Sequence, residues 1–223
     1  MPAIVDLSHT ITEGMTTYPG LDGPVIKDVM TRQQSFRAME GASSFSIKSI
    51  DIVANTGTYL DTPHHRFETG YDLSELDLTK VTNVPGVVIQ HSGPRLDPHL
   101  IADVDVHGKA VLFLTGWSSF FGTESYGASH HPFVSSALVE ALVEAGPSVV
   151  GIDSVNIDSM SDLARPAHSG LLAAGIPIVE HLTHLDRLPT SGFRFFAVPP
   201  AVAGVGTFPV RAFAILDERN PEP

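Results

Sequence analysis

The 223-residue sequence contains no cysteine, and this absence excludes several chemistries together. Without thiols the chain forms no disulfide, no thiolate nucleophile and no zinc site built on sulfur. Any metal ion must therefore be bound through His, Asp or Glu, and the chain has 11 histidines. No nucleotide-binding glycine fingerprint occurs either, so we expect no nucleotide or organic cofactor.

Positive charge is also scarce. The chain has 13 Lys and Arg against 25 Asp and Glu, a formal net charge of −12, and charged residues make up only 17% of it. Such a surface repels phosphate backbones and anionic lipid headgroups, and no local basic patch offsets the repulsion. We therefore expect a small-molecule substrate and no nucleic-acid or membrane partner. No signal-peptide pattern and no run of about 18 apolar residues occurs, so we expect a cytoplasmic protein.

Short apolar runs recur along the chain and predict buried strands. They lie at 86–90, 110–114, 148–152, 176–179, 193–198 and 210–216, and an alternating segment at 43–55 predicts a further, long strand. Helices are predicted at 134–145 and 166–174. Strand–helix–strand units in the middle, with strands lacking helices at both ends, predict an α/β fold with a mixed, strongly curved sheet and flanking helices. No low-complexity linker divides the chain, so we expect a single domain over residues 1–223.

The densest group of reactive side chains follows the long predicted strand. An amide, a phenol, a carboxylate and two imidazoles occur within 11 residues, at Asn55, Tyr59, Asp61, His64 and His65. A polar turn would explain the group without any chemistry, because Asx turns often precede proline. A catalytic interpretation requires partners from elsewhere in the chain.

Four residues far along the chain are candidate partners: Asp153, Asp158, His168 and Glu180. Glu180 directly follows the apolar run 176–179, at the carboxyl end of a predicted strand, where open α/β sheets bind ligands. His168 lies in the first turn of the second predicted helix, so we expect it to meet the same edge of the sheet.

Several segments match one known family in order along the chain. They are Asp6-Leu7-Ser8-His9, Tyr18-Pro19-Gly20, Gly151-Ile152-Asp153-Ser154, His168 with Glu180 twelve positions later, and Pro209-Val210-Arg211-Ala212. Over nearly its full length the chain resembles the cyclase/kynurenine formamidase superfamily of metal-dependent amide and lactam hydrolases, which includes isatin hydrolases. The family signature H-x-G-T-H-x-D-x-P-x-H is N-x-G-T-Y-x-D-x-P-x-H here, from Asn55 to His65.

The resemblance implies a role for each matching position. Metal ligands are implied at Asp61, His168 and Glu180, an acid/base histidine at His65, and a substrate-facing aromatic residue at Tyr18. Asn55 and Tyr59 stand where two imidazole ligands are expected. The family also implies a swivelling β/β/α fold and a homodimer or higher homo-oligomer.

The two departures from the signature change the expected metal site. An Asn carbonyl is a weak ligand for zinc or manganese, and a neutral Tyr is weaker still, so we do not expect a two-metal site. Asp61, His168 and Glu180 remain as a set that can hold one Zn²⁺ or Mn²⁺ with an open position for water. Asn55 and Tyr59 are then expected to bind substrate, together with Tyr18.

Three functions remain open. The first is a hydrolase that acts on the C–N bond of a small cyclic or linear amide, with His65, Glu180 and His168 as its catalytic residues. The second is a metal-free lyase or cyclase in which the same three side chains exchange protons and Asn55 and Tyr59 donate hydrogen bonds to a substrate oxygen. The third is a non-catalytic relative that binds a small molecule. We expect the first.

Overall fold

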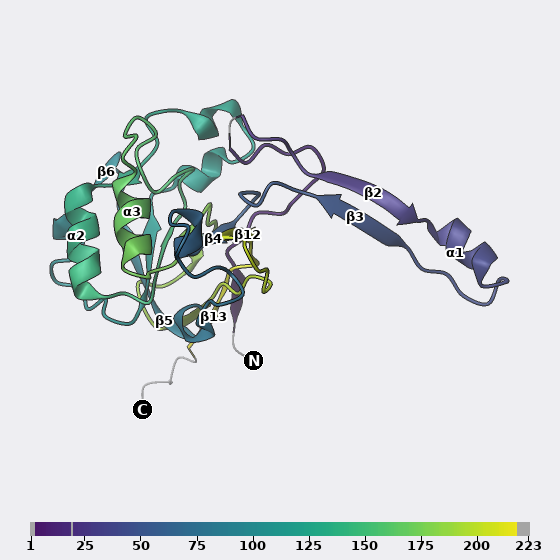
Figure 1. The fold of residues 1–223 in the computed structure, drawn as a ribbon. Coiled ribbons are helices and arrows are strands. Elements are labelled where there is room, and N and C mark those ends of the chain that lie inside the picture. The colour runs from purple at the N-terminus through teal and green to yellow at the C-terminus, as the bar shows by residue number, and fades with distance from the viewer. Residues whose placement is uncertain (1–2, 19, 218–223) are drawn as a thin grey trace.

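The computed structural model describes residues 3–18 and 20–217; Pro19, part of one matching segment, lies outside the described residues. Its centre is a nine-stranded mixed sheet that curls strongly and carries helices on one side (Figure 1), which confirms the predicted fold class. In order across the sheet the strands are β1 (Ile4–Asp6), β13 (Phe213–Leu216), β11 (Phe193–Phe196), β5 (Val84–Gln90), β7 (Ala110–Leu114), β9 (Val149–Ile152), β10 (Ile178–Glu180), β4 (Tyr59–Asp61) and β12 (Thr207–Pro209).

The middle of the sheet is parallel and its two ends are antiparallel. Strands β5, β7, β9 and β10 run parallel, whereas β4 and β12 on one side and β11, β13 and β1 on the other pair antiparallel. The parallel part requires crossover connections, and two of these carry α2 (Ser136–Ala145) and α3 (Pro166–Ala173). Both helices were predicted from the sequence. Among the residues that the structure describes, no helix is long and apolar enough to cross a membrane.

The predicted long strand at 43–55 is only partly correct. Strand β3 (Ile47–Asp51) pairs with β2 (Val25–Met30) in a separate two-stranded sheet, and the two are connected through α1 (Arg32–Ala38). These three elements form an arm that projects from the body (Figure 1). Every residue of β3 is exposed. The alternating apolar residues of this segment are therefore not buried against the rest of the chain.

The remaining elements are short. A second two-stranded sheet pairs β6 (Arg95–Leu96) with β8 (Phe133–Val134). Single turns of 3₁₀ helix are η1 (Pro63–His65), η2 (Leu78–Lys80), η3 (Pro98–Leu100), η4 (Trp117–Phe120), η5 (Glu124–Gly127) and η6 (Leu185–Arg187).

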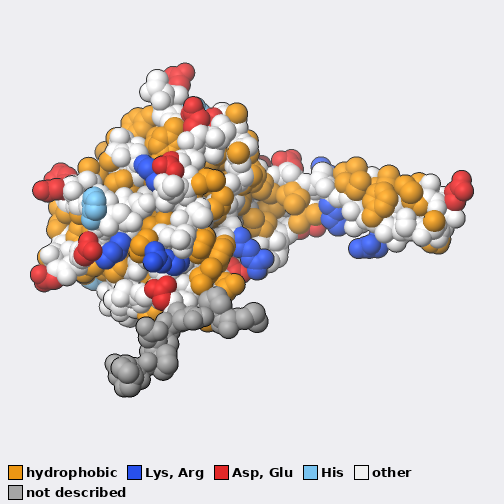
Figure 2. All heavy atoms as spheres, turned by 90° about the horizontal axis from the view of Figure 1, so that it is seen from below, with side chains coloured by type: hydrophobic (Ala, Val, Ile, Leu, Met, Phe, Trp, Pro, Cys, Tyr) orange, Lys and Arg blue, Asp and Glu red, His pale blue; other side chains and the backbone are white. Residues whose placement is uncertain are grey.

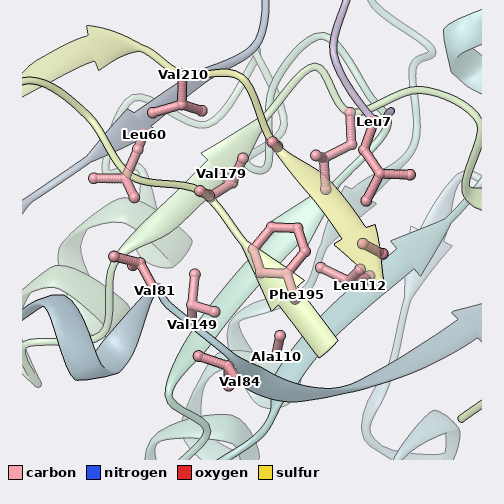
Figure 3. Close-up of a cluster of buried hydrophobic side chains, with 14 of the residues drawn as sticks. Leu7, Leu60, Val81, Val84, Ala110, Leu112, Val149, Val179, Phe195 and Val210 are labelled. Atoms are coloured by element: carbon pink, nitrogen blue, oxygen red, sulfur yellow. The ribbon is translucent and has the colours of Figure 1, made fainter. Parts of the chain in front are cut away.

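Hydrophobic side chains cover both faces of the curled sheet. Because side chains alternate along a strand, Val111 and Phe113 of β7 pack toward α2 and α3, whereas Ala110 and Leu112 point to the other face. The second group, shown in Figure 3, includes Phe195 among side chains from most strands of the sheet. This packing on both faces fixes the position of the short strand β4, whose three residues are fully buried.

Candidate active site

Strand β4 places the reactive side chains of the signature at one end of the sheet. In the antiparallel pairing with β10, Tyr59 lies opposite Glu180, and in the pairing with β12, Asp61 lies opposite Thr207. Tyr59 and Asp61 are two residues apart and therefore point to the same face of the sheet. The strand register thus brings two carboxylates, a phenol and a hydroxyl together.

His65 is held against Asp61 by a threonine that sequence analysis did not identify. The Thr207 hydroxyl donates to Asp61 Oδ1, and its oxygen lies 2.7 Å from His65 Nδ1. Because the hydroxyl has one proton and donates it to Asp61, His65 Nδ1–H must be the donor to Thr207. The remaining nitrogen of His65, Nε2, then carries a lone pair. The His65 side chain is 33% exposed, so it is accessible to a substrate.

His168 reaches the same point from the first turn of α3. Its Nδ1 lies 2.7 Å from Asp158 Oδ2, and Asp158 also accepts the backbone N–H groups of Ala167 and His168 at the start of the helix. The other nitrogen, Nε2, lies 3.8 Å from Asp61 Oδ2 and 3.7 Å from Glu180 Oε2. A carboxylate behind an imidazole in this way orients the ring and strengthens it as a metal ligand.

The site has the electrostatic character of a cation site. Burial alone would lower the pKa of His168, but the surrounding carboxylates of Glu180, Asp158 and Asp61 outweigh burial and raise this pKa to about 10. Burial raises the pKa of Asp61. Burial acts in the same direction on Glu180, but His168, His181 and Tyr59 together outweigh it and lower the pKa of Glu180 to about 2. The buried carboxylates therefore keep His168 protonated. A metal ion bound at the same place would supply the positive charge that this proton now supplies.

The donor atoms present fit a divalent ion. One ligand atom each from Asp61, His65 and His168 lie within 4.8 Å of one another. Asp61 Oδ2 is buried and has no hydrogen-bond partner among the described residues, which is costly for a carboxylate oxygen unless a cation binds there. The chemistry of the group, oxygen with imidazole nitrogen, suits zinc and manganese. Asp61 and His168 also belong to the ligand set predicted from the sequence.

Loading the metal-free protein with Zn²⁺ at neutral pH is expected to release about one proton per ion, because the ion must displace the proton from His168. The affinity for Zn²⁺ should rise as the pH approaches 10, because His168 then loses this proton even when no metal ion is bound. Since the pKa of His168 lies above its ordinary value of 6.5, the protonated ring stabilises the metal-free fold fully below pH 6.5 and progressively less as the pH rises through 10. Calorimetry in buffers of different ionisation enthalpy measures the released protons, and metal uptake with no proton release would contradict this account.

Glu180 differs from Asp61 because both of its oxygens have protein donors. Oε1 accepts the backbone N–H of Ile157, and Oε2 accepts the Tyr59 hydroxyl at 2.6 Å. Glu180 does not belong to the compact donor group, although its Oε2 faces His168 Nε2 at 3.7 Å. The structure thus places two predicted ligands, Asp61 and Glu180, within 4 Å of the third, His168, and adds His65 as an alternative third donor.

A buried hydrogen-bonded chain fixes the phenol of Tyr59. His181 Nε2 lies 3.3 Å from the Tyr59 hydroxyl, and Tyr126 Oη lies 2.8 Å from His181 Nδ1. Burial lowers the pKa of His181 to about 4, so the ring is neutral and has one N–H. Because Tyr59 gives its proton to Glu180, His181 donates from Nε2 and accepts from Tyr126. The sequence singled out neither His181 nor Tyr126 for this role, since only the fold brings them to Tyr59.

Restoring imidazoles with the double substitution Asn55→His and Tyr59→His is expected to raise bound Zn²⁺ or Mn²⁺ by about one equivalent per chain. The variant should nevertheless lose activity, because the hydrogen bond from Tyr59 to Glu180 and the amide of Asn55 disappear. Metal analysis and turnover on the same sample measure both effects. A variant that gains no metal would show that positions 55 and 59 do not converge on Asp61.

A cavity of about 310 Å³ opens onto these groups. It is lined by Tyr18, Leu21, Asn55, Tyr59, His65, Arg66, Asn156, Arg165, His168 and Glu180. The three residues expected to bind substrate, Tyr18, Asn55 and Tyr59, therefore line the same cavity as the histidines. Asp61 lies behind them and is fully buried.

A family model matches most of the chain. The model named Cyclase aligns with residues 5–159. The chain belongs to the cyclase family. It is 27% identical, over 94% of its length and 96% of the relative, to a kynurenine formamidase of Salinibacter ruber.

Two solved structures share the fold. Isatin hydrolase A from Labrenzia aggregata superposes with a TM-score of 0.82 at 22% identity, covering 97% of this chain and 94% of the other. A protein described as a potential metal-dependent hydrolase with cyclase activity superposes with a TM-score of 0.79 at 25% identity, covering 98% of this chain and 100% of the other. The family expected from the signature is thus confirmed.

Proposed function

We propose that this protein hydrolyses the C–N bond of a small linear or cyclic amide, of the formamide or lactam class, with the help of one divalent ion, zinc or manganese. The observation that carries the proposal is the buried Oδ2 of Asp61, which has no hydrogen-bond partner within the described part of the chain, beside His65 and His168 and next to a cavity of about 310 Å³. The names of two similar proteins, a kynurenine formamidase and an isatin hydrolase, support the same reaction class.

Asp61 and His168 would hold the ion, with Glu180 as the third ligand. When bound, a divalent ion polarises a carbonyl and lowers the pKa of a bound water. The lone pair of His65 Nε2 then has a separate task, which is to accept the proton of the attacking water. In the reaction, the water oxygen bonds to the carbonyl carbon, the C–N bond breaks, and His65 returns the proton to the leaving nitrogen.

The other cavity residues position the substrate and the carboxylates. Tyr59 and the backbone of Ile157 fix both oxygens of Glu180, and Asp158 fixes the ring of His168. Tyr18 and Asn55 face the same space and supply an aromatic surface and an amide for a substrate oxygen. Rigid placement of this kind lowers the barrier because little reorganisation is needed during the reaction.

A metal-free lyase or cyclase is the second candidate function. The observation that favours it is the proton on His168, whose pKa lies at about 10, between two buried carboxylates. In that reaction His168 would act as the acid and Glu180 or His65 as the base.

Release of formate from formanilide, and ring opening of isatin, test the proposed reaction directly. We expect turnover of at least one of them, and loss of that turnover on treatment with a chelator. Turnover that persists at full rate with a chelator would favour the metal-free reaction, and absence of C–N cleavage in both substrates would contradict the proposal.

The proposal includes a homodimer. The arm exposes large apolar side chains from β2, α1 and β3, and Figure 2 shows hydrophobic side chains gathered along it. Val29 is 62% exposed, Ile50 61% and Phe36 50%. A two-stranded ribbon is marginally stable by itself, and such apolar surface is usually covered. We propose that a second copy of the same chain covers the apolar side chains of the arm, because every solution of the protein contains other copies of it.

Light scattering after gel filtration is expected to give twice the chain mass of 23.8 kDa. The double substitution Val29→Glu and Ile50→Glu should shift the protein toward monomer, because buried glutamates at a contact are strongly unfavourable. Ser49→Glu, on the same strand, is the matched control and should leave the mass unchanged. A monomeric wild-type protein at micromolar concentration would contradict the dimer.

Two further parts of the proposal concern organisation and location. We propose that residues 1–223 form one domain, because β1 and β13, from opposite ends of the described chain, pair in the same sheet. We also propose that the protein is cytoplasmic. A chain without cysteine forms no disulfides, so an oxidising compartment would not stabilise it.

A further inference from the structure

Two arginines line the cavity beside the reactive histidines. Arg66 directly follows His65, and Arg165 precedes α3 by one residue and His168 by three. The rings of His65 and His168 have centroids 5.6 Å apart. Each histidine therefore has an arginine close to it on its own segment, and both arginines face the space where a substrate would lie.

The Arg66 side chain contacts the segment that carries Arg165. Arg66 Nε donates to Ser169 Oγ and Nη2 to the carbonyl of Ala164, each at 3.2 Å. Ala164 immediately precedes Arg165, whose Nη1 donates to the carbonyl of Ser159 at 3.2 Å. These neutral acceptors hold both guanidinium groups in place without neutralising their charge.

Among the described residues, neither arginine forms an ion pair with a carboxylate. The three buried carboxylates of the site contact other side chains: Oδ1 of Asp61 accepts from Thr207, Asp158 contacts His168, and Glu180 accepts from Tyr59. A guanidinium has five N–H donors, and the contacts above use only a few of them. Two positive charges with unused donors in one cavity are unusual in a chain of net charge −12.

The backbone at Arg165 is held in an unfavourable conformation. Arg165 has φ 50° and ψ 61°, the left-handed region, at the N-cap of α3, and its side chain makes no capping hydrogen bond. Ser, Thr, Asp, Asn or Gly is the usual residue at an N-cap. The side chain is half-buried and lines the cavity. Strained conformations of this kind cluster at functional sites.

We propose that Arg66 and Arg165 bind a carboxylate of the substrate, so that the amide hydrolysed here carries an anionic group close to its scissile bond. This inference rests on the proposed function and narrows its substrate class. A planar guanidinium binds a carboxylate through two parallel hydrogen bonds, so a cavity lined by two guanidinium groups suits a carboxylate better than a neutral group. The carboxylate takes no part in bond breaking: water adds to the amide carbonyl, the nitrogen gains a proton, and the anionic group leaves unchanged on the product.

Two substrates that differ only in this group test the proposal: formanilide and N-formylanthranilate, which carries an ortho carboxylate. The wild-type protein is expected to have a kcat/KM at least about 10-fold higher for the carboxylate substrate, the size expected of a hydrogen-bonded charge pair. Arg165→Gln and Arg66→Gln should each lower this preference about 10-fold. Arg187→Gln, in η6 outside the cavity lining, is the matched control and should leave the preference unchanged.

Binding of the product makes the test independent of turnover. Calorimetry is expected to detect anthranilate binding but not aniline binding to the wild-type protein, with the affinity for anthranilate lowered about 10-fold in each variant. Arg66 is exposed, so its replacement leaves the fold intact even if that of Arg165 does not. Equal kcat/KM values for both formamides, unchanged in the variants, would overturn the inference while leaving the proposed function standing. If anthranilate binds in a way that depends on the arginines but neither formamide is cleaved, the anion site is supported and the proposed function is contradicted.

Discussion

Asparagine in place of Asp61 is expected to abolish binding of the divalent ion and to lower amide hydrolysis on the order of 10³-fold, the equivalent of several kcal/mol of transition-state stabilisation. The substitution preserves the shape of the side chain and the acceptor for Thr207 but removes the charge of the unpartnered oxygen. Asp61 belongs to both ligand sets considered above, so the effect does not depend on the identity of the third ligand. Metal analysis and steady-state kinetics on the same preparation measure it.

The same substitution should have the opposite effect on the metal-free fold. Burial raises the pKa of Asp61, so ionisation of this carboxylate costs stability, and that cost grows as the pH rises above the ordinary value of 3.8. Metal-free Asp61→Asn is therefore expected to melt at the same temperature as the metal-free wild type or higher, without the rise in Tm that Zn²⁺ gives the wild type. Asp103→Asn, in an exposed loop, is the control. An Asp61→Asn protein that binds the ion with wild-type affinity would contradict the assignment.

His65→Ala is expected to lower turnover by about 10²–10⁴-fold, the usual contribution of a general acid/base. His65 hydrogen-bonds to Thr207 through one nitrogen and presents the other to the cavity, and a methyl group does neither. If His65 moves protons, as we propose, the variant keeps its bound ion. If His65 is instead a ligand, metal and activity are lost together, so metal content separates the two roles.

His64→Ala is the matched control for this substitution. His64 occupies the neighbouring position of η1 but does not line the cavity, so its replacement should change turnover by less than about 3-fold, within the range of a surface substitution. Equal losses from the two substitutions would show that the segment, and not the His65 ring, is required.

Much of the site could be predicted because its residues mark the ends of regular elements. Glu180 ends an apolar run, and His168 lies in the first turn of a helix that begins at a proline. Because open α/β sheets bind ligands at the carboxyl ends of their strands, His168 was expected to meet the sheet edge that carries Glu180. Asp61 was placed with them by the family signature alone, since β4 pairs antiparallel with β10 and Asp61 lies opposite Ile178, at the start of that strand. The structure places His168 Nε2 3.8 Å from Asp61 Oδ2 and 3.7 Å from Glu180 Oε2.

Partners that depend on strand pairing or on loops could not be predicted. Thr207 reaches Asp61 only because β12 pairs with β4, and the two strands are far apart in the sequence. Tyr126 reaches His181 from a 3₁₀ turn with no periodic pattern. The sequence predicts a longer strand around β3 because apolar residues alternate in the same way in a half-buried strand of a sheet and in the exposed strand of an arm.

The metal content per chain, determined by elemental analysis while turnover is recorded on the same samples, tests the central claim most directly. A chelator would remove the ion in steps, and Zn²⁺ or Mn²⁺ would then be returned. The account predicts that C–N hydrolysis falls and recovers in proportion to bound metal and is complete at one equivalent per chain. Full hydrolysis at a metal content far below one equivalent would contradict it.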